Sequence, residues 1–296
     1  MKRLWHSPLA LLLVNGALLG LTPPLGKVAG ENGIPPAVWS FVISFGAGAV
    51  LLCALAARGG GVQLDAHRLR YFLVVAAVSF AGPNMLMFLA VPHLGAGFTG
   101  IMFTLTPVNT LILSLLLGVR RPNLLGAAGI VIGFMGAVIV ATTRGEVGRP
   151  AEMFWIGVGL LTPLCLAAGN IYRTMDWPGD TGPIELAVGS HLAAAGMLLI
   201  GTFLTGEIGA FERLADFPFL VIGQVVAAAT MYAFFFRLQA VGGPVYLSQI
   251  GYIGAAVGLL SGILFLGERY AALTWIGAAV LAVGVLVTTK AQNQAG

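Results

Sequence analysis

Charge is scarce in this sequence, and its scarcity decides the class of protein. Only 9% of the 296 residues are Asp, Glu, Lys or Arg, whereas 58% are hydrophobic. A soluble domain usually has about a quarter of its residues charged. The composition therefore excludes an ordinary soluble protein and indicates one that is embedded in a membrane.

Cysteine and histidine are also rare, with 2 and 4 residues respectively. Cys53 and Cys165 lie in apolar stretches without His or carboxylate neighbours, so we expect neither a disulfide framework nor a metal site. No cluster of catalytic groups shares one depth in the apolar stretches, which argues against an intramembrane enzyme. The sequence predicts no catalytic residue, no metal and no cofactor.

The 11 acidic residues all lie in connecting segments or at the ends of apolar stretches. Ion-driven carriers commonly place a carboxylate near the middle of the bilayer, so, among carriers, this distribution favours facilitated diffusion or exchange. An exporter of cationic drugs would also need such a carboxylate, and a sugar-phosphate carrier would need basic residues at mid-membrane, where we expect none. His191, inside its apolar stretch, is either a proton relay or a neutral histidine bonded to a neighbouring helix.

Apolar stretches of the length that crosses a bilayer, about 20 residues, recur along the whole chain. Because backbone groups in lipid must be satisfied within each segment, these stretches must be helices. The sequence thus predicts an all-α polytopic membrane protein with ten transmembrane helices. They are expected near residues 7–29, 35–57, 71–91, 95–119, 123–143, 151–173, 183–206, 216–240, 244–267 and 271–290.

The two halves of the chain share local motifs, which indicates an internal duplication. The matching motifs are Leu21-Thr22-Pro23 with Leu161-Thr162-Pro163, Leu94-Gly95-Ala96 with Val241-Gly242-Gly243, and Gly126-Ala127-Ala128 with Gly277-Ala278-Ala279. Because each copy holds five helices, an odd number, the second copy must run inverted through the bilayer, as in many secondary transporters. We therefore predict a first repeat over 1–145, an inverted second repeat over 146–290 and a short cytoplasmic tail over 291–296.

The distribution of basic residues gives the orientation. With the N-terminus in the cytoplasm, ten of the 15 Lys and Arg residues, Arg173 among them, fall on the cytoplasmic side. This arrangement satisfies the positive-inside rule, and the opposite one violates it. The net charge of +4 thus reflects topology and not nucleic-acid binding. We expect a multi-pass protein of the bacterial inner membrane with both termini cytoplasmic and the lipid bilayer as its surroundings.

Glycines recur at helical spacing in two of the predicted helices. Gly251, Gly254, Gly258 and Gly262 share one face of the ninth, and Gly126, Gly129, Gly133 and Gly136 form a similar stripe on the fifth. Small residues let helices approach closely in lipid. The stripes predict tight packing, either static or between bundles that move.

Several segments resemble the EamA-type proteins of the drug/metabolite transporter superfamily. They are Gly20 through Lys27, the passage Phe88 to Gly97 continuing to Leu105-Thr106-Pro107, and Leu264-Phe265-Leu266-Gly267-Glu268-Arg269 followed by Gly277-Ala278-Ala279. The resemblance covers nearly the whole chain. It departs from the family pattern at Gly118-Val119-Arg120-Arg121, where a Gly-Glu pair is usual, and at Tyr252-Ile253, where many members have proline.

The resemblance implies a ten-helix transporter that works by alternating access and exports amino acids, other metabolites or drugs. Within the family, the branch of bacterial aromatic amino-acid exporters is the most similar. We expect a monomer or weak homodimer whose partner is a small-molecule substrate, with no nucleic acid bound. Export of drugs or other metabolites, or a membrane subunit that transports nothing, are the alternatives.

Polar, aromatic and kink-forming residues mark the predicted substrate site. The equivalent Thr-Pro pairs of the two repeats should flank it, and i, i+3 or i, i+4 spacings place other side chains on shared helix faces. The predicted lining is Phe80, Asn84, Phe98, Met102, Thr162, Pro163, Tyr246, Gln249 and Tyr252, with Asn170, Gln224, Tyr232 and Ser248 as further candidates. Such a cavity suits a zwitterion with an apolar side chain, because amides and hydroxyls can bind its charged groups. For each residue, interhelical bonding or packing is the alternative.

Lys27 is predicted near the outer end of the first helix. Its ammonium either extends to the membrane interface or attracts a substrate carboxylate at the outer mouth. Glu268 is expected to pair with its neighbour Arg269 in an outer loop.

Overall fold

The computed structural model describes residues 7–118, 124–143 and 150–294, and within them the chain is helical without strands. The elements are α2 (Pro8–Glu31), α3 (Pro36–Ala56), α4 (Ala66–Val75), η1 (Ala76–Ala81), α5 (Gly82–Leu94), α6 (Ala96–Met102), η2 (Phe103–Leu105), α7 (Thr106–Leu116), α8 (Leu124–Thr142), α9 (Met153–Met175), α10 (Pro183–Leu204), η3 (Ile208–Asp216), α11 (Pro218–Ser248), α12 (Ile250–Leu266) and α13 (Ala272–Gln294). Here α4, η1 and α5 form one continuous rod, as do α6, η2 and α7.

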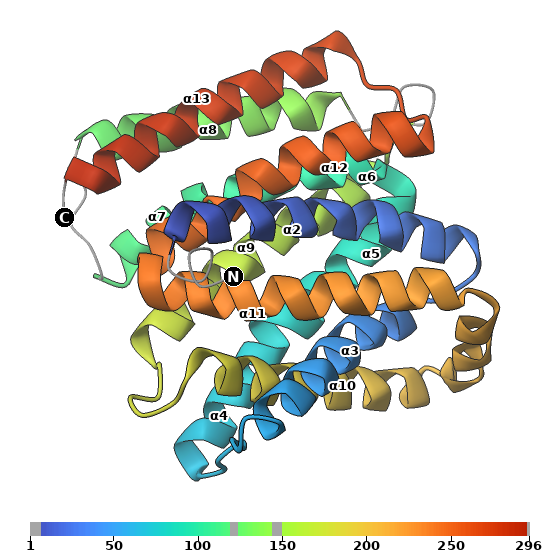
Figure 1. Ribbon diagram of the computed structural model, residues 1–296. Coiled ribbons are helices and arrows are strands. Elements are labelled where there is room, and N and C mark those ends of the chain that lie inside the picture. The colour runs from blue at the N-terminus through green and yellow to red at the C-terminus, as the bar shows by residue number, and fades with distance from the viewer. Residues whose placement is uncertain (1–6, 119–123, 144–149, 295–296) are drawn as a thin grey trace.

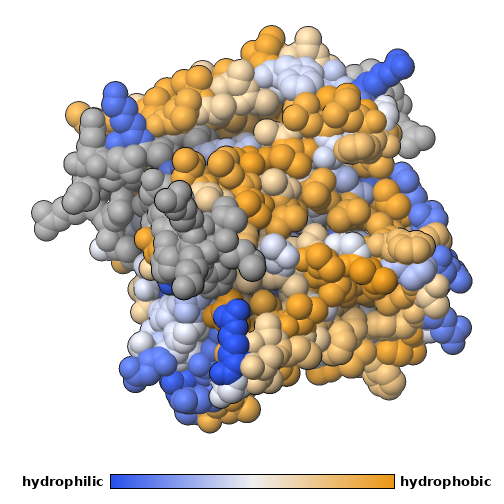
Figure 2. Space-filling view, in the orientation of Figure 1, coloured by the Kyte–Doolittle hydropathy of each residue, from blue (hydrophilic) through white to orange (hydrophobic). Residues whose placement is uncertain are grey.

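By length and composition, seven of these helices can cross a membrane: α2, α3, the α4–α5 rod, the α6–α7 rod, α9, α10 and α11. Shorter apolar helices are found at α8, α12 and α13. Figure 2 shows apolar residues across the middle of the visible face and hydrophilic residues gathered toward its left and right ends. The prediction of an all-helical, multi-pass membrane protein is confirmed.

The helices run between two ends of the bundle (Figure 1). One, which we call the Lys27 end, lies to the right and contains the connections α2–α3, α5–α6 and α12–α13. The other, the Arg173 end, lies to the left and contains the connections α3–α4, α9–α10 and α11–α12, together with the start of α2 and the end of α13. Residues at the Lys27 end and residues at the Arg173 end therefore lie on opposite sides of the bundle.

Prolines interrupt two of the rods where they pass the centre of the bundle. The π-helical turn η1 ends two residues before Pro83, and the 3₁₀ turn η2 ends two residues before Pro107. Proline has no backbone N–H and its ring clashes with the preceding turn, so the regular hydrogen-bond ladder cannot continue through it. Irregular turns of this kind are common at functional sites.

The glycine stripes pack helices at close range, as predicted. On α12, a Cβ atom added at Gly251 would lie 2.4 Å from the carbonyl oxygen of Phe103, and one at Gly20 of α2 would lie 2.5 Å from that of Gly254. Between α8 and α13, a Cβ at Gly284 would lie 2.3 Å from the amide nitrogen of Gly133. Only glycine allows such backbone approach. The stripes therefore join α12 to α2 and η2, and α13 to α8.

The main packing partners connect the early and late parts of the chain. α2 packs against α11 and α12, α9 against α5 and α7, α3 against α10 and α11, and α10 also against α4 and η1. α6 packs against α12, and α8 lies along α13.

Three boundaries differ from the sequence-based expectation. The expected break near Val241 is absent, because α11 continues to Ser248 and α12 begins only at Ile250. Gly and Pro are tolerated in helices that neighbouring helices surround, so Gly242-Gly243 did not end the helix. The α4–α5 rod starts earlier than expected, at Ala66, where Asp65 caps it by accepting a hydrogen bond from the Arg68 amide (2.8 Å). At the C-terminal end, α13 includes residues 291–294, which were expected to form a tail.

Candidate functional site

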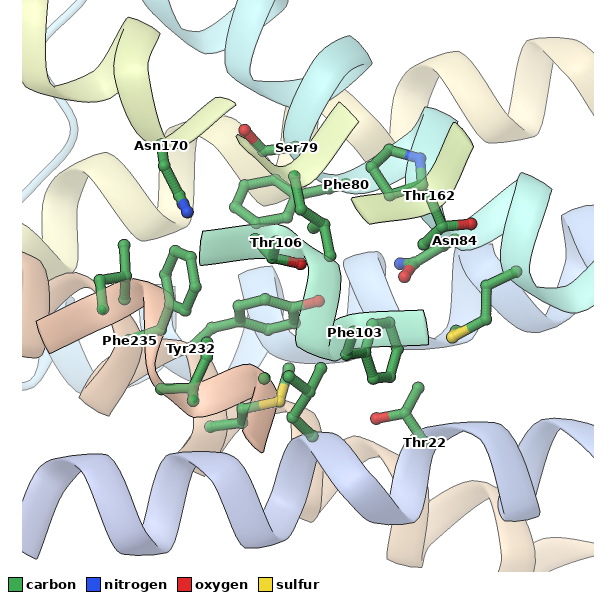
Figure 3. Close-up of a pocket in the computed structure, with 18 residues that line it drawn as sticks. Thr22, Ser79, Phe80, Asn84, Phe103, Thr106, Thr162, Asn170, Tyr232 and Phe235 are labelled. Atoms are coloured by element: carbon green, nitrogen blue, oxygen red, sulfur yellow. The ribbon is translucent and has the colours of Figure 1, made fainter. Parts of the chain in front are cut away.

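A cavity lies at the centre of the bundle, where the interrupted rods meet α2, α9, α11 and α12. The cavity has a free volume of about 50 Å³, and the residues that line it come from both halves of the sequence. Its 18 lining residues are Leu19, Thr22, Ser79, Phe80, Pro83, Asn84, Met87, Phe103, Thr106, Thr162, Leu166, Asn170, Met231, Tyr232, Phe235, Leu247, Ile250 and Gly251 (Figure 3).

The cavity wall combines aromatic rings with neutral polar groups. Asn84 Nδ2, Thr106 Oγ1 and Thr162 Oγ1 are buried and form no hydrogen bond within the described part of the chain. Buried polar atoms without partners are rare in proteins because they lose their hydration without compensation. In Figure 3, the Tyr232 hydroxyl points toward Asn84. The wall can therefore accommodate a molecule that has both an apolar part and hydrogen-bonding groups.

The structure places several of the predicted lining residues around this cavity. Phe80, Asn84 and Thr162 line it, as do the further candidates Asn170 and Tyr232. Pro163 follows Thr162 in α9 without lining the cavity itself, and Thr22 of the equivalent Thr-Pro pair lines it from α2.

Phe98 and Met102 lie elsewhere. They share one face of α6, as their spacing predicts, but that face belongs to a separate apolar cluster with Leu94 and Ile156. Met102 packs there because Gly159 of α9 has no side chain: a Cβ at Gly159 would lie 2.6 Å from the Met102 sulfur. The thioethers at the cavity come from Met87 and Met231 instead.

The residues expected along the ninth helix do not share one helix. Tyr246 and Ser248 belong to α11, Gln249 is the N-cap of α12, and Tyr252 lies in the first turn of α12. The Tyr246 side chain lies outside the described residues, and Gln249 and Tyr252 are half-buried without lining the cavity. The continuous α11 thus changes the helix assignment of this group.

His191 lies in α10 behind the cavity wall. Its ring is fully buried and stacks on Phe80 with ring centroids 4.0 Å apart, and it contacts the Tyr232 ring in a tilted arrangement with centroids 3.9 Å apart. Neither ring nitrogen has a hydrogen-bond partner among the described residues. The aromatic rings of Phe80 and Tyr232 lie between His191 and the cavity. A relay role for His191 stays a prediction.

Sequence reasoning missed three residues beside the rod interruptions. Ser79 lies in η1 next to the predicted Phe80, whereas Phe103 and Thr106 lie in and just after η2. The signal that could have located them is the pair Pro83 and Pro107, because the freed backbone groups next to a proline favour a cavity.

Arg173 was also missed, since it was counted only among the basic residues of the cytoplasmic side. The structure buries it: only 1% of the residue is exposed. It lies in the last turn of α9, and Cβ atoms in a helix tilt toward the N-terminus. The side chain therefore leans into the bundle, where it donates hydrogen bonds to Ser79 and Asn170 of the cavity wall.

Lys27 is paired at the opposite end. Its ammonium lies 2.6 Å from Glu268 Oε1, so the partner of Glu268 is Lys27 and the expected pairing with Arg269 is wrong. Glu268 also accepts hydrogen bonds from the amides of Ala96 (2.7 Å) and Gly97 (2.9 Å) and from the Tyr270 hydroxyl. We call these five residues the Glu268 cluster.

The backbone conformation at the end of α12 positions the Glu268 carboxylate. Gly267 ends α12 in the left-handed region (φ 65°), and the Glu268 amide then donates to the Gly262 carbonyl (3.0 Å), which turns the carboxylate toward the start of α6. Burial alone would raise the pKa of Glu268, but the bonds from Lys27, Tyr270, Gly97 and Ala96 outweigh it and lower this pKa below its ordinary value.

Comparison with known proteins finds a family match in the first part of the chain. Residues 6–142 match the profile of the EamA-like transporter family. A solved crystal structure, described only as that of a protein, matches 95% of this chain and 96% of its own chain with a TM-score of 0.67 at 17% identity, a likeness that concerns the fold. No curated protein matches the sequence. Through residues 6–142, the chain is therefore similar to the EamA-like transporter family.

Proposed function

We propose that this protein is a carrier that moves small neutral or zwitterionic metabolites, foremost amino acids with large apolar side chains, out of the cytoplasm by alternating access. The observation that carries the proposal is the central cavity, which residues from both sequence halves line with aromatic rings and unpartnered neutral polar atoms. Export is the direction that the resemblance to EamA-type proteins implies.

The helix pairings support two inverted five-helix repeats, 1–145 and 146–290. Counted five spans apart, the counterparts are α2 and α9, α3 and α10, the α4–α5 rod and α11, the α6–α7 rod and α12, and α8 and α13. Exchanging each helix for its counterpart turns the pair α2–α11 into α9–α5 and the pair α2–α12 into α9–α7, and the helices of these new pairs also pack against each other. The pairs α3–α10, α6–α12 and α8–α13 map onto themselves. A pseudo-twofold axis in the membrane plane requires this pattern. Thr22 and Thr162, at equivalent positions of the repeats, then contact the cavity from both sides.

The basic residues support a cytoplasmic Arg173 end. Among the described residues, Arg58, Arg68, Arg70, Arg173, Arg237 and Lys290 belong to this end, whereas Lys27, Arg213 and Arg269 belong to the other. The positive-inside rule places the richer end in the cytoplasm of a bacterial inner membrane.

The chemistry of the wall favours a neutral or zwitterionic cargo over a cationic drug. None of the 18 lining residues is acidic, so the wall offers no counter-charge for a cation without a carboxylate of its own. Phe80, Phe103 and Tyr232 can pack against an aromatic or large aliphatic side chain, while Asn84 and Thr162 offer hydrogen bonds.

Counterflow in proteoliposomes tests the proposal. Vesicles loaded with unlabelled phenylalanine should accumulate labelled phenylalanine faster than protein-free vesicles, with or without a pH gradient. Absence of flux for every amino acid in a panel would contradict the cargo assignment, and dependence on a pH gradient would contradict exchange.

Variants connect the flux to the cavity. Asn84→Ala and Thr162→Val should each reduce flux about tenfold, the equivalent of one hydrogen bond of about 1.4 kcal/mol. Phe219→Ala, whose side chain is 89% exposed on the apolar surface, is the matched control and should transport normally. Full activity of both cavity variants would remove this cavity from the transport path.

A further inference from the structure

Arg173 is a buried cation whose described partners are all neutral. Its Nε donates to Gln239 Oε1 (2.7 Å), Nη2 donates to Asn170 Oδ1 (2.6 Å) and Nη1 donates to Ser79 Oγ. The guanidinium also lies 4.8 Å from the Phe235 ring centroid. Three of its five N–H groups are thus engaged, which leaves one on each terminal nitrogen.

No described carboxylate compensates this charge. Asp176, one turn further along the chain, is bound by Arg70 (2.9 Å), His67 (3.1 Å) and the Tyr172 hydroxyl (2.6 Å) instead. Proteins pair a buried charge with an opposite one because desolvation of an unpaired ion is costly. A fold that keeps Arg173 buried among neutral groups gains nothing from the charge unless an anion binds there.

The position of Arg173 shows where such an anion would come from. On one side, Ser79, Asn170 and Phe235 hold the guanidinium and also line the central cavity. On the other side, Arg173 lines an open cleft at its own end of the bundle, together with Arg237, Trp177 and Gln239. The guanidinium therefore separates the cleft from the cavity, and Figure 3 shows Asn170 and Phe235 together at one end of the cavity.

We propose that Arg173 binds the carboxylate of the transported molecule as it passes between the cleft and the cavity, so that the cargo is a carboxylate-bearing zwitterion or monocarboxylate. A guanidinium fits a carboxylate with two parallel hydrogen bonds, which an amide or amine cargo cannot form. The apolar remainder of the cargo then lies against Phe80 and Tyr232. This assignment rests on the proposed carrier function and names the chemical group that the carrier selects.

Gln239→Glu is the sharpest test, because it keeps Arg173 and the shape of the site but places a carboxylate where an amide oxygen now lies 2.7 Å from Nε. The internal carboxylate should compete with the ligand. We expect an unfolding midpoint equal to or above that of the wild type, with phenylacetate binding at least tenfold weaker. Wild-type affinity for phenylacetate in this variant would overturn the assignment.

A pair of ligands of similar shape isolates the charge. Phenylacetate should raise the unfolding midpoint of the purified wild-type protein. Phenylacetamide should need at least a tenfold higher concentration to raise the midpoint by the same amount. Arg173→Gln should abolish the difference, Arg173→Lys should retain part of it, and Arg58→Gln, an exposed arginine at the same end, should retain all of it. Equal responses of the wild type to both ligands would overturn the assignment.

These measurements separate the two proposals. If vesicles show no amino-acid flux while Gln239→Glu loses phenylacetate binding, the carrier function fails and the Arg173 site stands. If flux is normal and unchanged in Arg173→Gln, the carrier function stands and the Arg173 site fails.

Discussion

Two charged side chains are buried at opposite ends of this bundle, and one has an oppositely charged partner whereas the other has only neutral described partners. Glu268 is 2% exposed and is surrounded by Lys27, two backbone amides and the Tyr270 hydroxyl. Arg173 is 1% exposed and contacts only neutral acceptors and aromatic rings among the described residues.

The difference distinguishes a structural charge from a binding one. A carboxylate with an ammonium and three hydrogen-bond donors has its desolvation compensated, so the Glu268 cluster joins α2, the start of α6 and the α12–α13 connection. A guanidinium among amides, a hydroxyl and rings has no such compensation. The first arrangement joins helices at the Lys27 end of the bundle, whereas the second leaves two guanidinium N–H groups unengaged among the described residues at the Arg173 end.

The largest expected effect comes from breaking the compensated charge. Glu268→Gln removes the carboxylate that lies 2.6 Å from the mostly buried Lys27 ammonium, and loss of one partner of a buried pair costs about 3 to 5 kcal/mol. The free energy of unfolding in detergent should fall by this amount. Arg269→Gln, an exposed neighbour, is the control and should change it little.

The double variant Glu268→Gln with Lys27→Met should be more stable than Glu268→Gln alone, because both charges are then removed. If the two changes instead add, Lys27 and Glu268 do not act as a pair, and the contrast with Arg173 fails.

Much of this fold could be predicted from the sequence, because the bilayer restricts the possibilities. Apolar length and helix spacing identified the membrane helices, and the glycine stripes identified close packing that a Cβ atom at Gly251 or Gly284 would prevent. The break between α11 and α12 was placed too early, since Gly242-Gly243 ends a helix only when no neighbouring helix supports it.

The site could be predicted only in part. Thr162 and Asn84 were found because a repeated Thr-Pro pair and a helical spacing mark them. The pairing of Lys27 with Glu268 joins residues 241 positions apart, and local sequence contains no signal for it. Arg173 was only assigned to the cytoplasmic side from its place at a helix end, and the inward lean of its side chain was not predicted.

A smaller effect should follow when the Glu268 cluster is disturbed by volume alone. In Gly262→Ala, the new Cβ would lie 2.3 Å from Glu268 Oε2, so the carboxylate must shift. We expect a loss of about 1 to 3 kcal/mol in unfolding free energy, as for overpacking in a core. Gly196→Ala in α10 is the control, because a Cβ there meets nothing within 4 Å and alanine favours a helix. Equal effects of both changes would show that the cluster tolerates the shift.

Acid should weaken the Glu268 cluster gradually. Because the folded protein lowers the pKa of Glu268 below the ordinary value of 4.5, the ionised carboxylate contributes stability above that value and loses it as the pH falls toward the folded pKa. The difference in unfolding midpoint between wild type and Glu268→Gln should therefore be constant near pH 7 and shrink below about pH 4.5. A difference that grows in acid would contradict the lowered pKa.

The smallest expected effect tests whether Arg173 is compensated by a charge further away. Asp176 is partly exposed and is bound by Arg70, itself 63% exposed in its side chain, and such surface pairs contribute about 1 kcal/mol or less. Asp176→Asn should change stability by no more than that, and phenylacetate affinity should stay within about twofold, as in the exposed control Asp180→Asn. If Asp176→Asn instead tightens phenylacetate binding tenfold, then Asp176 neutralises Arg173 through space, and the two buried charges differ only in the distance of their counter-ions.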